Sequence, residues 1–85
     1  MANWKKVLER VRSQQGEHDA GIRLEEFCIL LPHLGYSAKR QRGSHRVYDK
    51  EGWPPMVVVS GRDGKVKAYL VRKLREELEK HGYRS

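Results

Sequence analysis

The chain lacks the cysteine pairs of disulfide-stabilised proteins and the long apolar runs of membrane-spanning proteins. It holds one cysteine in 85 residues, so it cannot form an intramolecular disulfide, and this predicts an intracellular, cytoplasmic protein. No apolar run approaches the ~18–20 residues of a membrane span, and the N-terminus lacks the basic-then-apolar layout of a signal peptide. We therefore expect no membrane partner.

The residue groupings of several catalytic classes are also missing. No carboxylate pair, glycine-rich phosphate loop or Ser-His-Asp order is evident, and Cys28 and the histidines lack the spacing of metal ligands. A chain this short forms one hydrophobic core and is too small for a deep enclosed cavity. The sequence therefore predicts no metal site, no cofactor and no large enzyme.

Positive charge is what the chain has in excess, with 18 Lys and Arg against 11 Asp and Glu and a formal net charge of +7. Residues 1–35 are balanced, whereas residues 36–75 carry eleven basic and three acidic residues. A solvated surface could use such charge, but its confinement to one segment favours a phosphate-bearing partner.

Apolar residues at helical spacing predict a helix over residues 3–14, capped by Asn3, and a second over residues 22–34. Pro32 conflicts with the last turn of the second helix, because it removes a backbone donor and should kink the helix. Gly35 provides a stop. Both helices therefore precede the basic segment.

Three strands and a last helix are predicted next. Residues 36–42 and 45–50 are joined by Gly43-Ser44, which suits a hairpin with a two-residue type II′ turn. The β-branched run 56–59 predicts a third strand with both faces partly covered. Apolar spacing predicts a helix over residues 68–81.

This order predicts a two-layer α+β domain, in which a three-stranded antiparallel sheet is packed by helices on one face. We expect residues 21–85 to form that domain. Residues 1–20 would be a helical extension that either packs on the domain or serves as a separate interaction arm. The oligomeric state is left open.

Strand parity assigns the side chains of the hairpin to two faces: Arg40, Arg42, His45 and Val47 share one, and Lys39, Gln41, Arg46 and Tyr48 share the other. Neighbouring guanidiniums disfavour a protonated imidazole, so we expect His45 to be neutral near pH 7. A neutral imidazole can take the proton of a ribose 2′-OH, while cations stabilise the phosphate that this oxygen attacks. A lone histidine after a turn can equally be a plain surface residue.

The motif around this turn resembles a known family. Gly43-Ser44-His45-Arg46-Val47-Tyr48, preceded by Leu34-Gly35-Tyr36 and Arg40-Gln41-Arg42, is similar to the HicA toxins of bacterial toxin–antitoxin modules. The resemblance covers about residues 22–82. It implies an α-β-β-β-α fold like the double-stranded-RNA-binding domain, ribosome-independent cleavage of mRNA with His45 as the catalytic residue, and a HicB-like antitoxin that covers the basic hairpin face.

The chain departs from this family in its first twenty residues, in the start of its last helix, and in its third strand. Many relatives carry a further histidine in that strand, where this chain reads Met56–Ser60. A non-catalytic RNA-binding protein on the same fold therefore stays an alternative, as does a protein-binding module with an acidic partner. Tyr48, Lys39 and water are all open as the acid that protonates the leaving oxygen.

Two groups of residues are the predicted RNA contacts. The hairpin supplies Lys39, Arg40, Arg42, Ser44, Arg46 and Tyr48, and the start of the last helix supplies Lys65, Lys67 and Arg72. That helix places basic residues first and acidic residues later, against the helix dipole, which favours a phosphate-binding role. The simpler interpretations are i,i+4 pairs such as Arg75 with Glu79, and packing of Tyr48 in the core.

Overall fold

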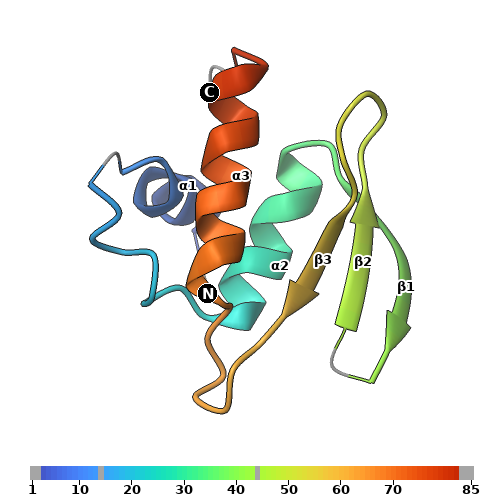
Figure 1. Cartoon of the computed structure of the whole chain (residues 1–85), viewed down its shortest axis with the longest axis horizontal. Helices are drawn as coiled ribbons and strands as arrows, with labels where there is room; N and C mark the ends of the chain where they lie inside the picture. The colour runs from blue at the N-terminus through green and yellow to red at the C-terminus, as the bar shows by residue number, and fades with distance from the viewer. Residues whose placement is uncertain (1–2, 14, 44, 83–85) are drawn as a thin grey trace.

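The computed structural model describes residues 3–13, 15–43 and 45–82. They form three helices and one antiparallel sheet, in the order α1 (Trp4–Arg12), α2 (Leu24–His33), β1 (Ser37–Arg42), β2 (His45–Asp49), β3 (Met56–Val59) and α3 (Ala68–Lys80). The strand order is β1-β2-β3, and the helices gather to one side of the sheet (Figure 1). The predicted α+β architecture is confirmed, with α1 added before the α-β-β-β-α order.

Helix α1 packs on the rest of the molecule instead of standing apart as an arm. It begins after Asn3, whose Oδ1 accepts a hydrogen bond from the backbone N–H of Lys5 at 3.0 Å. Val7, Leu8 and Val11 are buried in the same core as α2 and α3. This helix therefore contributes to the one hydrophobic core.

Helix α2 continues through Pro32 to His33. Because Pro32 stands in the last turn, the only helical bond that its missing N–H can remove is the one to the carbonyl of Cys28. The chain then turns at Gly35, which has a φ of +96°, and the N–H of Tyr36 donates to the carbonyl of Leu31 at 3.1 Å. A proline in the next-to-last position of α2 thus does not end the helix before it.

The hairpin of β1 and β2 has the predicted register. Arg42 faces His45 across the two-residue turn, and Gly43 has the positive φ, +55°, that such turns need. Ser44 lies outside the described residues, so the type II′ turn stays a prediction. Between Ala38 and Arg40 the register shifts, and Lys39 occupies a β-bulge that the sequence did not predict.

Strand β3 is covered mainly on one face. Met56 and Val58 are fully buried against the helices, whereas Val57 on the other face is 40% exposed. The predicted partial cover of both faces is limited to the end of the strand, where Val59 is half-buried. The sheet therefore has one face in the core and one open face.

Arg75 of α3 holds the segment that follows α1. Its guanidinium donates to the carbonyls of Val11 and Ser13, both at 3.0 Å, and makes two bonds to the carboxylate of Asp19, at 2.9 and 3.1 Å. The side chains of Arg75 and Asp19 are only 12% and 8% exposed. Arg75 is therefore mainly a structural residue and not simply the surface partner of Glu79.

An aromatic group ties the loop between β2 and β3 to the C-terminal end of α3. The rings of Trp53 and His81 stack at 4.2 Å, Tyr36 meets Trp53 edge-on, and the Nζ of Lys50 lies 3.9 Å from the centre of the Trp53 ring. This group lies at the end of the molecule opposite the β1–β2 turn (Figure 1). Within the described ranges, no helix is long and apolar enough to cross a bilayer.

Candidate nucleic-acid interface

The open face of the sheet, defined by Arg40, Arg42, His45, Val47 and Val57, carries the predicted catalytic residue. The pairs Arg42–His45 and Arg40–Val47 place the two arginines on the same face as the histidine. The pair Val47–Val57 extends this face onto β3. Both arginines and His45 are exposed. The structure therefore brings these three side chains together as strand parity predicted.

Charge on the open face is positive near His45. Among the described residues, neither Arg40 nor Arg42 takes part in an ion pair. Asp49 is the acidic residue of β2 that shares this face. It stands four residues from His45, a separation of about 13 Å along the strand. An anion that approaches His45 thus meets guanidiniums first, above a small apolar centre of valines.

The other face of the hairpin turns into the core. The side chain of Tyr48 is buried, and this burial, together with the neighbouring Cys28, raises the pKa of its hydroxyl to about 12. Arg46 is half-buried, with its Nη1 3.6 Å from the Sγ of Cys28. The ring of Tyr48 is packed in the core, so little of its surface is left for the RNA contact that the sequence predicts. The same burial removes Tyr48 as the acid for the leaving oxygen.

Lys39 lies at the outer edge of the sheet. The bulge places it beside a shallow depression of about 280 Å³, lined by Ala38, Lys39, Arg40, Gln41, Arg46, Val47 and Tyr48. Lys39 is exposed, and it precedes Arg40 on β1. Lys39 and water are thus the remaining candidates for the acid. Ser44, another predicted contact, lies outside the described residues.

The second predicted group surrounds the start of α3. The N–H of Lys67 donates to the carbonyl of Val59 at 3.3 Å, and Val59 pairs with His45 on the other side. Lys67 is therefore two strand spacings from His45, about 10 Å. Arg72 is exposed one turn further along α3. The hairpin turn and the start of α3 lie at the same end of the molecule (Figure 1).

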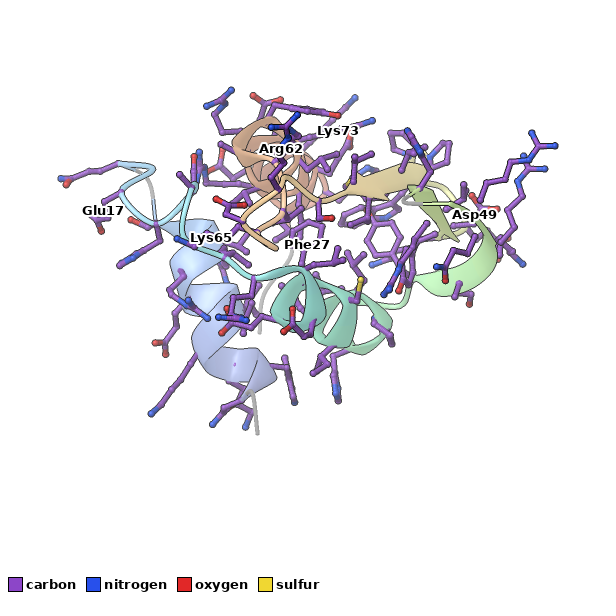
Figure 2. All side chains as sticks on the ribbon, turned by 90° about the horizontal axis from the view of Figure 1, so that it is seen from below. Glu17, Phe27, Asp49, Arg62, Lys65 and Lys73 are labelled. Atoms are coloured by element: carbon purple, nitrogen blue, oxygen red, sulfur yellow. The ribbon has the colours of Figure 1, made fainter. Side chains whose placement is uncertain are left out.

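Lys65 is placed differently from these two. It is half-buried, its backbone bridges to Arg23, and its N–H donates to the Oδ1 of Asp63 at 3.0 Å. Viewed from this end, Arg62 and Lys73 project to one side of the molecule, whereas Lys65 projects elsewhere (Figure 2). Arg62 and Lys73 are further exposed cations of the same basic segment, outside the predicted RNA contacts.

In the part of the chain that the structure describes, no group of three or more His, Cys, Asp or Glu side chains could hold a metal ion. Comparison with known proteins finds no family model that matches the sequence, no similar curated protein and no matching solved structure. The functional assignment therefore depends on the motif and on the geometry of the site.

Proposed function

We propose that this protein is a HicA-like endoribonuclease toxin that cleaves mRNA. The observation that carries the proposal is the exposed His45, which faces Arg42 across the hairpin and shares the open face with Arg40. Histidine is the side chain most often used for proton transfer, and arginine matches the geometry of phosphate. An open face suits a polymer, because a strand of RNA can lie across it without entering a cavity.

The reaction follows from these roles. His45 takes the proton of a ribose 2′-OH, and the resulting oxygen attacks the adjacent phosphorus. Arg40 and Arg42 stabilise the added negative charge on the phosphate oxygens. The bond from phosphorus to the 5′-oxygen then breaks, and this oxygen receives a proton from Lys39 or water. The products are a 2′,3′-cyclic phosphate and a free 5′-hydroxyl, and DNA is not a substrate because it lacks the 2′-OH.

The proposed partners are mRNA and a HicB-like antitoxin. The exposed cations of the hairpin make no ion pairs among the described residues, so an acidic protein surface could neutralise them while covering His45. The protein would act in the bacterial cytoplasm, where both partners are present.

A specific observation favours a second candidate, a non-catalytic RNA-binding protein. His18 belongs to the segment between α1 and α2, and His33 and His81 stack on tryptophans, so among the described histidines only His45 lies on the open face. The hydroxyl of Tyr48 lies on the other side of the sheet. If neither Lys39 nor water can protonate the leaving oxygen fast enough, the same face would bind RNA without cleaving it.

The substitution His45→Ala tests the proposal. We expect the wild-type protein to arrest growth when it is induced, and the purified protein to cleave RNA. His45→Ala should lower the cleavage rate by about 100-fold or more, which is the usual contribution of one general base. It should still bind RNA, because the arginines remain.

His18→Ala is the matched control, because His18 is an exposed histidine in the segment between α1 and α2. It should cleave at the wild-type rate. Cleavage by His45→Ala at the wild-type rate would overturn the proposed catalytic role. Binding of intact RNA by the wild-type protein, with no product after long incubation, would establish the second candidate instead.

A further inference from the structure

Tyr69 is an exposed aromatic side chain in the first turn of α3. It is 54% exposed, more than Ile29 at 42% and Val57 at 40%, which are the other large hydrophobic residues exposed in the described ranges. On the opposite side of α3, the side chains of Leu70, Val71 and Leu74 are buried in the core. Their burial fixes the orientation of α3 and turns Tyr69 outward, so its ring is not part of the core.

Two cations share the side of α3 that carries this ring, and two more precede the helix. Arg72 and Lys73 stand three and four residues after Tyr69 and therefore share its side of the helix. Lys67 precedes it by two residues, and Arg62 projects to the same side as Lys73 (Figure 2). We call these five residues the Tyr69 patch. Arg75 is not part of it, because its guanidinium is occupied by Asp19.

The cations of the Tyr69 patch are available to a ligand. None of the four takes part in an ion pair among the described residues, and α3 has no acidic residue in its first turn. An aromatic ring among several cations matches the chemistry of a polynucleotide, whose bases stack on rings and whose phosphates bind cations. An acidic protein would use the cations but would gain less from the ring.

Backbone pairing links the patch to the proposed catalytic residue. His45 pairs with Val59, and the carbonyl of Val59 accepts the N–H of Lys67. Helix α3, with Tyr69 at its second position, starts directly after Lys67. A strand of RNA that leaves His45 and crosses the end of β3 therefore reaches Lys67 first and the ring next.

We propose that Tyr69 is a base-stacking platform for a nucleotide a short distance from the scissile phosphate, with Arg62, Lys67, Arg72 and Lys73 holding the flanking phosphates. This inference rests on the proposed function. Because a base must be unpaired to stack on a protein ring, the substrate is single-stranded where it crosses α3. The patch thus selects unpaired RNA, whereas the open face supplies the chemistry.

The test measures binding of a short fluorescein-labelled oligouridylate with 2′-O-methyl groups, which resists cleavage through the 2′-oxygen. Tyr69→Ala should weaken binding by about 5- to 100-fold, the range found when one stacking ring is removed. Tyr69→Phe should bind within about twofold of wild type, because the ring is kept. Ile29→Ala is the matched control, since it removes an exposed apolar side chain outside the patch.

Two further measurements separate stacking from a general loss of affinity. On an abasic oligomer of the same length, Tyr69→Ala and wild type should bind equally, because no base is present to stack. The dependence of log affinity on log salt should keep its slope in Tyr69→Ala, whereas Lys67→Ala should reduce the slope by about 0.7, the value for one phosphate contact on a single strand.

The outcomes separate this inference from the proposed function. Equal binding of the oligouridylate by wild type and Tyr69→Ala would overturn the stacking role and leave the RNase proposal standing. A loss that is just as large on the abasic oligomer would also overturn it. If the wild-type protein binds neither oligomer, the stacking inference is wrong, and cleavage of unmodified RNA decides the proposed function separately.

Discussion

The histidines His33, His81 and His45 differ in their surroundings, and these surroundings determine the role of each imidazole. His33 stacks on Trp4 at 4.5 Å with nearly parallel rings, and His81 stacks on Trp53 in the same manner. Both imidazoles are held by apolar faces that fix local structure. His45 instead stands exposed beside the arginines of the hairpin. Arginine side chains match the geometry of phosphate, so this position is the one that fits the proposed chemistry.

A prediction at the residue scale concerns Tyr36, whose hydroxyl is buried without a hydrogen-bond partner among the described residues. Burial, together with the negative charge of Glu77, raises the pKa of Tyr36 to about 12. In the unfolded chain a tyrosine ionises near its ordinary pKa, about 10. The neutral Tyr36 of the folded state therefore contributes stability that is fully present below pH 10 and lost as the pH rises through 12.

We expect the free energy of unfolding to fall by about 2–3 kcal/mol across this range on account of Tyr36 alone. Tyr36→Phe should show a shallower loss between pH 9 and about 11.5, because phenylalanine has no proton to release. Urea unfolding at a series of alkaline pH values measures both slopes. Parallel slopes for the two proteins would show that Tyr36 ionises as easily in the folded state as in the unfolded state.

At the scale of elements, the hairpin could be predicted in part. The pair Arg42–His45 follows from Gly43-Ser44, because a two-residue turn leaves one register. The bulge at Lys39 could not be predicted, since the run Ser37–Arg42 is polar except for Ala38 and shows no alternation that an inserted residue would interrupt. The local sequence therefore predicts the turn but not the β-bulge at Lys39.

The burial of Tyr48 could not be predicted from its own strand. Parity correctly separated Tyr48 and Arg46 from His45, but it could not say which face meets the helices. Two residues before Tyr48, on the same face of β2, stands Arg46. The strand therefore lacks the apolar alternation that is typical of a core face. Its burial depends on Cys28 of α2 and on Met56 of β3, which tertiary packing brings against it.

Gly43 gives a prediction at this scale, because the turn sets the register that places Arg42 opposite His45. Its φ of +55° is unfavourable for residues with a Cβ, although no atom outside its immediate neighbours lies within 4 Å of an added Cβ. Gly43→Ala should lower the free energy of unfolding by about 1 kcal/mol. Gly43→Asn should cost less, because asparagine tolerates this conformation better.

Thermal unfolding of the two variants at equal concentration distinguishes these expectations. If the backbone is strained, the wild type should have the highest melting temperature, Gly43→Asn a lower one, and Gly43→Ala the lowest. Equal melting temperatures for the alanine and asparagine variants would mean that φ at this turn relaxes when a side chain is added.

For the whole molecule, the contact between Arg75 and Asp19 is the feature that the sequence could least predict. The two residues are 56 positions apart, and neither belongs to a local pattern that points to the other. The local i,i+4 pattern instead pointed to Glu79 as the partner of Arg75. The contact joins α3 to the segment after α1, so it helps to hold α1 in the shared core.

Removing one member of a buried ion pair leaves the other charge unpaired in a poorly solvated site. Arg75→Met or Asp19→Asn should therefore lower the free energy of unfolding by about 3–5 kcal/mol, and the double variant by less than the sum of the two. Arg75→Lys should also destabilise, since an ammonium cannot reproduce the paired bonds to a carboxylate. Urea unfolding measures each value.

Arg72→Met is the control for this prediction, because Arg72 is an exposed arginine on the same helix. Its effect should stay within about 0.5 kcal/mol. If Arg75→Lys and Asp19→Asn also change the free energy of unfolding by no more than this, the buried pair contributes little to the stability of the fold.

Strand β1 is a free edge of the sheet, and all six of its residues are exposed. An uncovered edge can pair with the edge of another copy and begin aggregation. The bulge at Lys39 interrupts such pairing, and the cations of two approaching edges repel each other. The positive charge of this edge therefore also opposes its pairing with the edge of another copy. Where a bound polyanion neutralises that charge, it removes the repulsion that keeps copies apart.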